Sequence, residues 1–349
     1  MKVGLVGFPG SGKTTVYNAL TGQRAETGYA GRGSGKTNLG TVKVPDPRIE
    51  ALAQIHNPKK ITFAETVFVD VAAPPGAGGR SLDPSAIAAM REVDALVQVV
   101  RAFPAEDGKA PDPLGELVDL STEMTIGDLA PIEKRLERMK KEKGKPGEQE
   151  LLLRLKAHLD DGGVLRDLTL SDQEVQLLSG YRFLTQKPLL IIFNVAEKDI
   201  KTELPADVAA YLKEHKLTGI SLCGQLEMDI AALVPDEQQA FLADLGLSEP
   251  AIGRFIRAAY AALDLISFLT AGEDECRAWT IRRGTAAQRA AGKIHSDIER
   301  GFIRAEVIAY DDFMQHKSEA KAREAGKSRL EGKEYVVRDG DIIHFRHAT

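Results

Sequence analysis

The stretch KVGLVGFPGSGKT at residues 2–14 decides the fold of this chain. It opens with an apolar run, Lys2–Val6, that predicts a buried β-strand. The next eight residues, GFPGSGKT, fit the pattern G-x-x-x-x-G-K-[ST], and residues 15–20 predict a helix. A strand, a glycine-rich loop and a helix in this order predict a phosphate-binding loop, or P-loop.

The chemistry of phosphate binding explains the residues of this loop. The glycines let backbone N–H groups turn toward phosphate oxygens, and the helix N-terminus adds a positive dipole end. Lys13 is predicted to reach the β- and γ-phosphates and is the candidate catalytic residue, while the Thr14 hydroxyl is predicted to ligate Mg²⁺. The predicted phosphate contacts are Gly7, Gly10, Ser11, Gly12, Lys13, Thr14 and Thr15.

Further short apolar runs alternate with helical patterns through the first half of the chain and again near residue 190. Several are rich in Val, Ile and Leu without alternation, which is typical of parallel strands buried on both faces. We therefore predict an α/β fold with a mostly parallel, doubly wound sheet. Its expected strands are residues 2–6, 41–44, 66–70, 95–100, 189–193 and 219–222.

Residues 121–180 lose the strand pattern and predict an antiparallel helical hairpin inserted into the α/β domain. Apolar residues recur at helical spacing at positions 126, 129, 132, 136 and 139, and again at 151, 152, 155 and 159. Residues 143–147 have turn chemistry, and Pro131 either starts a helix or kinks one. The basic run at residues 134–143 leaves two interpretations open, contact with RNA or a partner and a solvated helix face.

The chain from residue 265 predicts a small mixed β domain. Its expected strands are residues 265–269, 277–281, 303–309, 335–337 and 341–345, with a tight turn at 338–341. His295 is more simply a packed or surface side chain than a catalytic one. An RNA-facing patch and an ordinary mixed-charge surface are both open for Arg282, Arg283, Lys293, Arg300 and Arg304.

Two other segments are predicted to complete the phosphate site. Asp70 ends an expected strand, where a carboxylate holds Mg²⁺ through water. Residues 31–37 imitate a second P-loop but lack its first glycine, so we predict a switch loop in which Ser34 or Thr37 supplies a further Mg²⁺ ligand. Ala73 and Pro74 follow Asp70 at the positions where switch GTPases carry Gly and often a water-orienting Gln.

The base-binding motif departs from that of GTPases. Asn194-Val195-Ala196-Glu197 stands where the GTPase motif N-K-x-D is expected. Glu197 replaces the Asp that binds guanine and Val195 replaces the Lys that covers it, which favours adenine recognised by backbone groups near Val195. The expected base-side contacts are Asn194, Val195 and Glu197, with Cys223 and Gln225 in a following loop; Cys223 is also well explained as a packing residue.

These motifs together resemble the YchF/Obg-like ATPase family over nearly the whole chain. The resemblance rests on the P-loop, on Phe68-Val69-Asp70-Val71-Ala72, on the N-x-x-E motif, and on C-terminal runs from Phe268 to Val307. It implies a G domain (residues 1–120 and 184–264), an inserted helical or coiled-coil domain (121–183) and a C-terminal TGS domain of β-grasp type (265–349). It also implies Mg²⁺-dependent, slow hydrolysis of ATP, which is either preferred over GTP or used alongside it, and association with the ribosome or ribosomal RNA.

The sequence departs from this family around the γ-phosphate. Gly10-Ser11 stands where the family has Asn-Val, and Ala73-Pro74 where it has Gly-Leu. A nucleotide-binding module with little turnover is therefore an alternative, and a P-loop small-molecule kinase is a more distant one.

Composition limits the partners and the compartment. The chain has 349 residues, 43% hydrophobic and 28% charged, with a net charge of -5, so the whole molecule is no general nucleic-acid binder and no DNA sequence recognition is expected. Two widely separated cysteines and the lack of a signal peptide or membrane-length apolar run predict a cytoplasmic protein without membrane contact.

Overall fold

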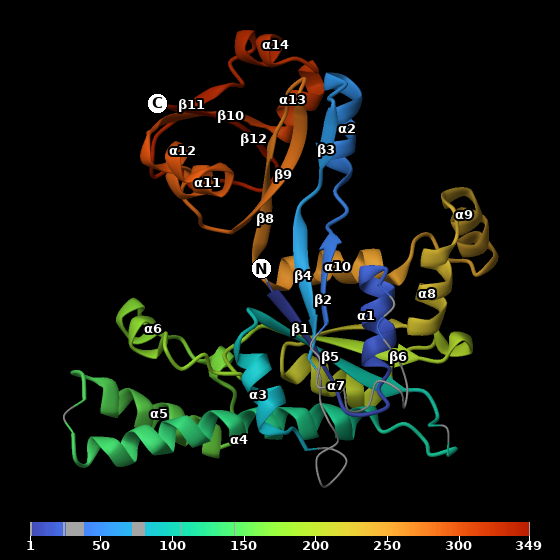
Figure 1. The fold of residues 1–349 in the computed structure, drawn as a ribbon, viewed down its shortest axis with the longest axis vertical. Helices are drawn as coiled ribbons and strands as arrows, with labels where there is room; N and C mark the ends of the chain where they lie inside the picture. The colour runs from blue at the N-terminus through green and yellow to red at the C-terminus, as the bar shows by residue number, and fades with distance from the viewer. Residues whose placement is uncertain are drawn as a thin grey trace. The chain divides into compact units, whose positions relative to one another are not determined.

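The computed structural model describes residues 2–23, 25, 38–71, 81–105, 107–142 and 144–348 (Figure 1). The chain forms two compact units. The first comprises Met1–Thr41 and Val67–Ile252, and the second comprises Val42–Thr66 and Gly253–Thr349. In the described part of the chain, no helix is both long enough and apolar enough to cross a membrane.

The first unit is built on a six-stranded sheet in the order β2-β4-β1-β5-β6-β7. The pairs β1–β4, β1–β5, β5–β6 and β6–β7 are parallel. Loops that follow parallel strands meet at the carboxyl edge of the sheet, so the segments after β1, β4, β6 and β7 gather there. The strands are β1 (Lys2–Val6), β2 (Asn38–Lys43), β4 (Glu65–Asp70), β5 (Ala95–Ala102), β6 (Leu189–Val195) and β7 (Thr218–Leu222).

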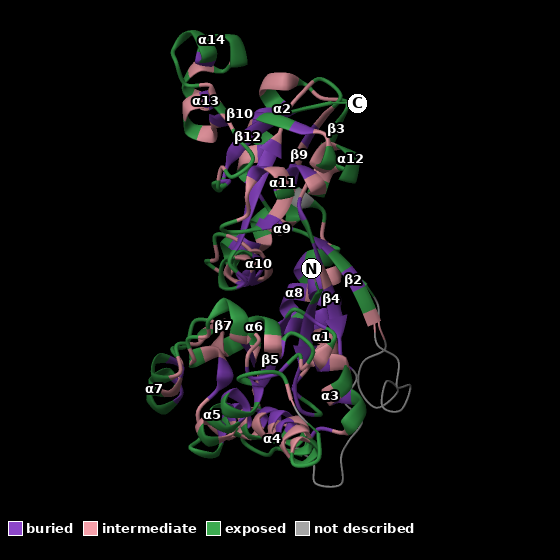
Figure 2. Ribbon diagram, turned by 90° about the vertical axis from the view of Figure 1, so that its left-hand side faces the viewer, coloured by how far each residue is buried: buried purple, intermediate pink, exposed green. Residues whose placement is uncertain are grey.

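Both faces of this sheet are covered, which confirms the predicted α/β class. All seven residues of β6 are buried, and Figure 2 shows the central strands coloured as buried. Leu189, Ile191 and Phe193 point into a core shared with α3 (Pro84–Arg91), α4 (Pro113–Met139) and α7 (Ala206–Glu214). Helices α1 (Lys13–Thr21) and α8 (Gly224–Ala232) pack against each other, and α9 (Pro235–Asp244) follows α8. Burial on both faces explains why these strands lack alternation.

The predicted helical hairpin consists of α4 and α5 (Glu148–Asp160), which lie side by side in Figure 1. Helix α4 starts earlier than expected, at Pro113, because Asp112 caps it by accepting a hydrogen bond from Gly115 N at 3.1 Å. Ile132 is fully buried, as predicted, whereas Ile126 is 57% exposed, so its assignment to the apolar face is wrong. A 3₁₀ turn, Leu165–Asp167, and α6 (Asp172–Leu178) lead back toward β6.

Pro131 lies inside α4 and neither starts nor ends it. Proline has no N–H, so the carbonyl of Gly127, four residues earlier, loses its helical donor. The guanidinium of Arg91 donates to this carbonyl at 2.7 Å instead. The next residue, Asp128, is fully buried and accepts hydrogen bonds from Leu184 N and Thr185 N, both at 2.8 Å. Burial raises the pKa of Asp128, and these bonds and Arg91 oppose that rise. The hairpin is therefore anchored to the α/β unit through polar groups at its proline.

The second unit contains a six-stranded sheet in the order β11-β10-β12-β8-β9-β3. Strand β12 is antiparallel to β10 and parallel to β8, and β3 lies parallel to β9. The strands are β3 (Lys60–Thr62), β8 (Leu265–Thr270), β9 (Glu275–Arg282), β10 (Phe302–Ala309), β11 (Arg329–Glu331) and β12 (Asp341–His347). The helices are α2 (Pro47–His56), α10 (Ala251–Ala262), α11 (Ala287–Ile294), α12 (Ser296–Arg300), α13 (Tyr310–His316) and α14 (Glu319–Glu324).

Four of the five strands predicted in this region are present, and the strand predicted at residues 335–337 is wrong. Of that segment, Val336 makes only an isolated bridge to Ala286. Its backbone instead holds the start of α11, because Tyr335 O accepts from Ala287 N at 2.8 Å and Val337 N donates to Thr285 O at 3.0 Å. The predicted turn at 338–341 is present, with Asp341 N donating to Arg338 O at 3.1 Å.

Candidate functional site

The loop between β1 and α1 has the geometry that a P-loop requires. Gly10 and Gly12 have φ angles of 85° and 80°, a region that favours glycine. A Cβ at Gly12 would lie 2.1 Å from Asn194 Nδ2, and a Cβ at Gly7 would lie 2.6 Å from the carbonyl oxygen of Val99. The conformation and the close approach of neighbours therefore both require glycine in this loop.

A lysine and a threonine at the start of α1 meet an aspartate at the end of β4 beside this loop. The ammonium of Lys13 forms an ion pair with the Asp70 carboxylate, and Thr14 Oγ1 donates to Asp70 Oδ2 at 3.2 Å. Asp70 ends β4 and is 4% exposed, while Lys13 and Thr14 begin α1 next to β1. The structure thus brings together three of the predicted phosphate and metal residues.

Asn194, on β6, connects the P-loop to the start of α8. Its side chain is 5% exposed and lies at the end of β6. Asn194 Nδ2 donates to the carbonyl of Ser11 at 3.0 Å, and its Oδ1 accepts from Gly224 N at 2.9 Å. Both sides of the amide are therefore used to fix the loop and the start of α8, so this side chain positions the site.

The other residues of the predicted base motif differ in exposure. Val195 is buried in the core of the first unit, so its backbone is the part that a base could meet. Glu197 is exposed at the start of a 3₁₀ turn, Glu197–Asp199. Cys223 is buried beside Leu226, as a packing residue would be, and Gln225 is exposed and donates to Asp229 at 3.1 Å.

Two residues near the site were missed by the sequence reasoning. Asn38 Nδ2 lies 3.4 Å from Asp70 Oδ2, so β2 begins at the same carboxylate where β4 ends. Phe103 follows β5, and its ring lies 3.9 Å from the place where a Cβ of Gly12 would be. The sequence signal for Phe103 was its position: it is an aromatic residue that directly follows β5, and β5 pairs with the P-loop strand β1. Ser34, Thr37, Ala73 and Pro74 lie outside the described residues.

The oxygen ligands at the site are those that Mg²⁺ prefers. Thr14 and Asp70 supply a hydroxyl and a carboxylate, and a nucleotide supplies phosphate oxygens. Among the described residues, no group of three or more His, Cys, Asp or Glu side chains could hold a metal by itself. This composition fits an ion that binds together with a nucleotide. His295 belongs to the second unit, where it accepts from Asp297 N at 3.2 Å.

The P-loop, the carboxylate on the adjacent strand and the parallel sheet define a P-loop nucleoside triphosphatase of the GTPase type. Residues 2–154 match a family model described as 50S ribosome-binding GTPase. Residues 265–348 match the YchF-GTPase_C family, described as a protein of unknown function.

Relatives of known name match almost the entire chain. The Ribosome-binding ATPase YchF of Haemophilus ducreyi is 41% identical, covering 99% of this chain and 98% of its own. That of Bacillus subtilis is 38% identical, with 99% of both chains covered. The solved structure of the Schizosaccharomyces pombe YchF GTPase is 30% identical, with a TM-score of 0.87 over 99% of this chain and 97% of its own. The chain therefore belongs to the YchF family.

Proposed function

We propose that this chain binds ATP with Mg²⁺ at its P-loop, hydrolyses it slowly, and does so in association with the ribosome. The observation that carries the proposal is the meeting of Lys13, Thr14 and Asp70 at the carboxyl edge of the sheet. The names of the relatives, which describe ribosome-binding ATPases, support the choice of nucleotide and partner. A cytoplasmic location would follow from a ribosomal partner.

Each residue of the site has a role in this proposal. Backbone N–H groups from Gly10 to Thr15 cradle the phosphates, and Lys13 moves from Asp70 to the β- and γ-phosphate oxygens when they are bound. Thr14 and Asp70 would hold Mg²⁺, which neutralises charge on the phosphates. Phosphate positioning and electrostatic stabilisation would then supply most of the rate enhancement. Catalysis by positioning and charge stabilisation, without an assigned general base, is consistent with slow turnover.

The surroundings of the base motif support adenine over guanine. Guanine recognition in GTPases relies on an Asp carboxylate and a Lys stem, and this chain has Glu197 and Val195 at those positions. Val195 is buried, so it cannot cover a base as a Lys stem does. Backbone groups beside Val195 and the Phe103 ring near Gly12 would instead form the base side of the site.

The test is equilibrium binding of ATP and of GTP with Mg²⁺, alongside a Lys13→Ala variant and phosphate release under multiple turnover. We expect ATP to bind at least about tenfold more tightly than GTP, a difference of about 1.4 kcal/mol. Tighter binding of GTP would overturn the adenine assignment. Binding without phosphate release would favour the nucleotide-binding module, and phosphoryl transfer to an added small acceptor would favour a kinase.

Co-sedimentation of the full chain with ribosomes tests the second half of the proposal. We expect the wild-type chain to sediment with 70S ribosomes in buffer of low salt concentration. If the chain stays in the supernatant with and without nucleotide, the ribosomal part of the proposal is wrong, whatever its ATPase activity.

A further inference from the structure

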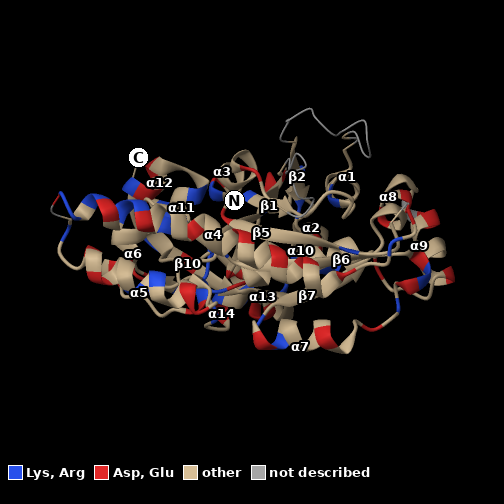
Figure 3. Ribbon diagram, turned by 90° about the horizontal axis from the view of Figure 1, so that it is seen from below, with Lys and Arg blue, Asp and Glu red and all other residues tan. Residues whose placement is uncertain are grey.

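The end of the helical hairpin carries a charge opposite to that of the rest of the chain. Residues 134–145 hold two acidic side chains and seven basic ones, a net charge of +5, so the remainder of the chain carries -10. Figure 3 shows this concentration of Lys and Arg at the left-hand end of the hairpin. The basic residues are Lys134, Arg135, Arg138, Lys140, Lys141, Lys143 and Lys145.

A buried carboxylate holds this tip in one shape. Glu148, at the start of α5, accepts two hydrogen bonds from Arg135 on α4, both at 2.8 Å. It also accepts from Lys145 N at 3.0 Å and from the Tyr181 hydroxyl at 3.3 Å. The Arg135 guanidinium, as the main cause, lowers the pKa of Glu148 to about 2, so the carboxylate is ionised at neutral pH. Helix α4, the turn and the segment after α6 are thus fixed by a single side chain.

Two glycines of the turn lie beside these contacts, Gly144 and Gly147. A Cβ at Gly144 would lie 2.2 Å from Met139 Cε and 3.1 Å from Glu148 Oε2. Gly147 has a φ angle of 76° and forms the N-cap of α5. The left-handed conformation of Gly147 and the bond from Lys145 N to Glu148 therefore fix the start of α5 at the end of this turn.

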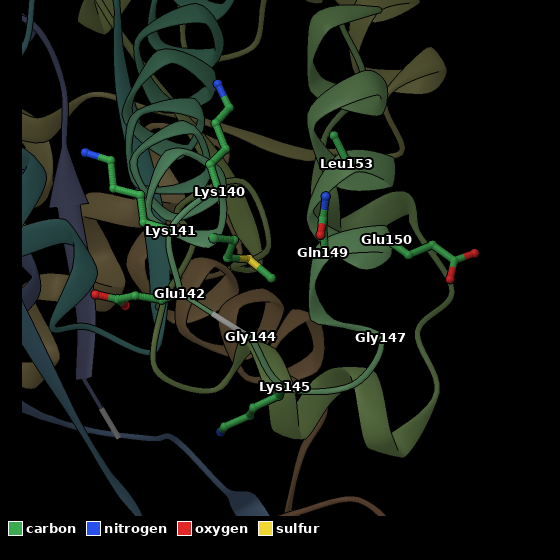
Figure 4. A pocket seen from close by; sticks show the side chains of 10 residues that line it. Lys140, Lys141, Glu142, Gly144, Lys145, Gly147, Gln149, Glu150 and Leu153 are labelled. Carbon is green, nitrogen blue, oxygen red and sulfur yellow. The ribbon is translucent and has the colours of Figure 1, made fainter.

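The charged ends of these side chains are available to a partner. Lys134, Arg138, Lys140, Lys141 and Lys145 are all exposed. In Figure 4 the side chains of Lys141 and Lys145 extend away from α5, and the carboxylate of Glu150 lies on the opposite side. Lys140 also pairs with Glu137, but both side chains are 70% exposed, and such pairs are weak in water.

We propose that the described part of this tip, residues 134–142, 144 and 145, binds the phosphate backbone of RNA on the ribosome. The inference rests on the proposed ribosomal association and names the surface that would make the contact. Flexible lysines act as point charges that suit phosphates without selecting a base sequence. The apolar side chains that line the groove between the ends of α4 and α5 are Met139 and Leu153, whereas the core of a protein interface is rich in aromatic residues and poor in Lys and Glu. Phosphate contacts therefore fit the tip better than a protein partner does.

The experiment compares two matched double variants of the full chain with the wild type. Lys140→Gln/Lys141→Gln removes two charges from the C-terminal end of α4. Lys213→Gln/Lys216→Gln removes two exposed charges from the C-terminal end of α7, in the same unit. Binding to 70S ribosomes and to ribosomal RNA stripped of protein is measured at several KCl concentrations. ATP hydrolysis without ribosomes is measured as a check on folding and on the P-loop.

We expect the tip variant to bind both probes about tenfold or more weakly, with the slope of log K against log [KCl] reduced by about 2. The control variant should match the wild type, and both variants should hydrolyse ATP as the wild type does. Unchanged binding by the tip variant would overturn the proposal. Weaker binding to ribosomes with unchanged binding to stripped RNA would also overturn it, by pointing to a ribosomal protein. If the wild type fails to bind ribosomes, the proposed function fails, and binding to stripped RNA then decides whether the tip recognises phosphates.

Discussion

Replacing Asn194 by Asp tests how the P-loop is held in place. The two side chains have nearly the same size, but Asp cannot donate a hydrogen bond when ionised. The substitution keeps the acceptor for Gly224 N at 2.9 Å and removes the donor to the Ser11 carbonyl at 3.0 Å. It also brings a negative oxygen against that carbonyl in a site that is 5% exposed.

The expected loss of stability follows from these contacts. A buried carbonyl left without a partner costs about 1–3 kcal/mol, and burying a carboxylate without a cation costs more. The N-terminus of α8 offsets about 0.3–1 kcal/mol of this, because Gly224 begins that helix. We expect the free energy of unfolding to fall by about 2–4 kcal/mol. ATP affinity should fall at least about tenfold, because the displaced carbonyl belongs to the P-loop.

Asn18→Asp is the matched control. Asn18 is also a buried asparagine, 4% exposed, whose amide donates to Ala25 O at 2.8 Å and accepts from Ala25 N at 2.9 Å. Urea unfolding should show a similar loss of stability in both variants, while ATP binding should be weakened mainly in Asn194→Asp. An Asn194→Asp protein that binds ATP as tightly as the wild type would refute the assigned role.

Three further changes test other parts of the structure. Glu148→Gln should lower the free energy of unfolding by about 2–3 kcal/mol near pH 7; since the folded pKa is about 2, this difference should shrink as pH falls from about 4.5 toward 2, and chemical unfolding between pH 2 and 7 checks it. Ser11→Ala removes a buried hydroxyl that has no partner among the described residues, so unfolding in urea should show no loss, or a gain of up to about 1 kcal/mol. Arg48→Ala removes ion pairs with Asp46 at 2.8 Å and Asp339 at 3.0 Å, and calorimetry should show a loss of about 2 kcal/mol in the second unit.

The phosphate site could be predicted from the sequence because its residues stand at the ends of buried strands. A parallel strand that is covered on both faces produces an uninterrupted apolar run, and Asp70 and Asn194 each end such a run. A polar side chain at the end of a buried parallel strand lies at the carboxyl edge of the sheet, where ligands bind in such folds. Asn38 escaped notice because it begins a half-exposed strand with no comparable apolar pattern.

The structures of β3 and of residues 335–337 depend on tertiary contacts that the local sequence pattern does not predict. Strand β3 has three residues, and polar side chains fix it: Thr62 donates to Glu275 at 2.5 Å and Lys59 to Asp274 at 2.7 Å. The segment 335–337 has the composition of a strand, yet its backbone groups bond to the start of α11. In both cases tertiary hydrogen bonds override the local preference.

The division of the chain into units also escapes a linear reading of the sequence. Asn38 and Asp70 lie 3.4 Å apart, side chain to side chain, at the phosphate site. The chain between them contributes α2 and the edge strand β3 to the second unit, where Arg48 binds Asp339 and the His56 ring stacks on Phe313 at 5.5 Å. If each unit were one continuous segment of the chain, the two could be cut apart at a single position. The second unit instead combines residues 42–66 with residues 253–349. Here removing residues 42–66 would take a strand and a helix from the second unit and break the chain that joins Asn38 to Asp70, so the integrity of that unit and the geometry of the nucleotide site depend on the same 25 residues.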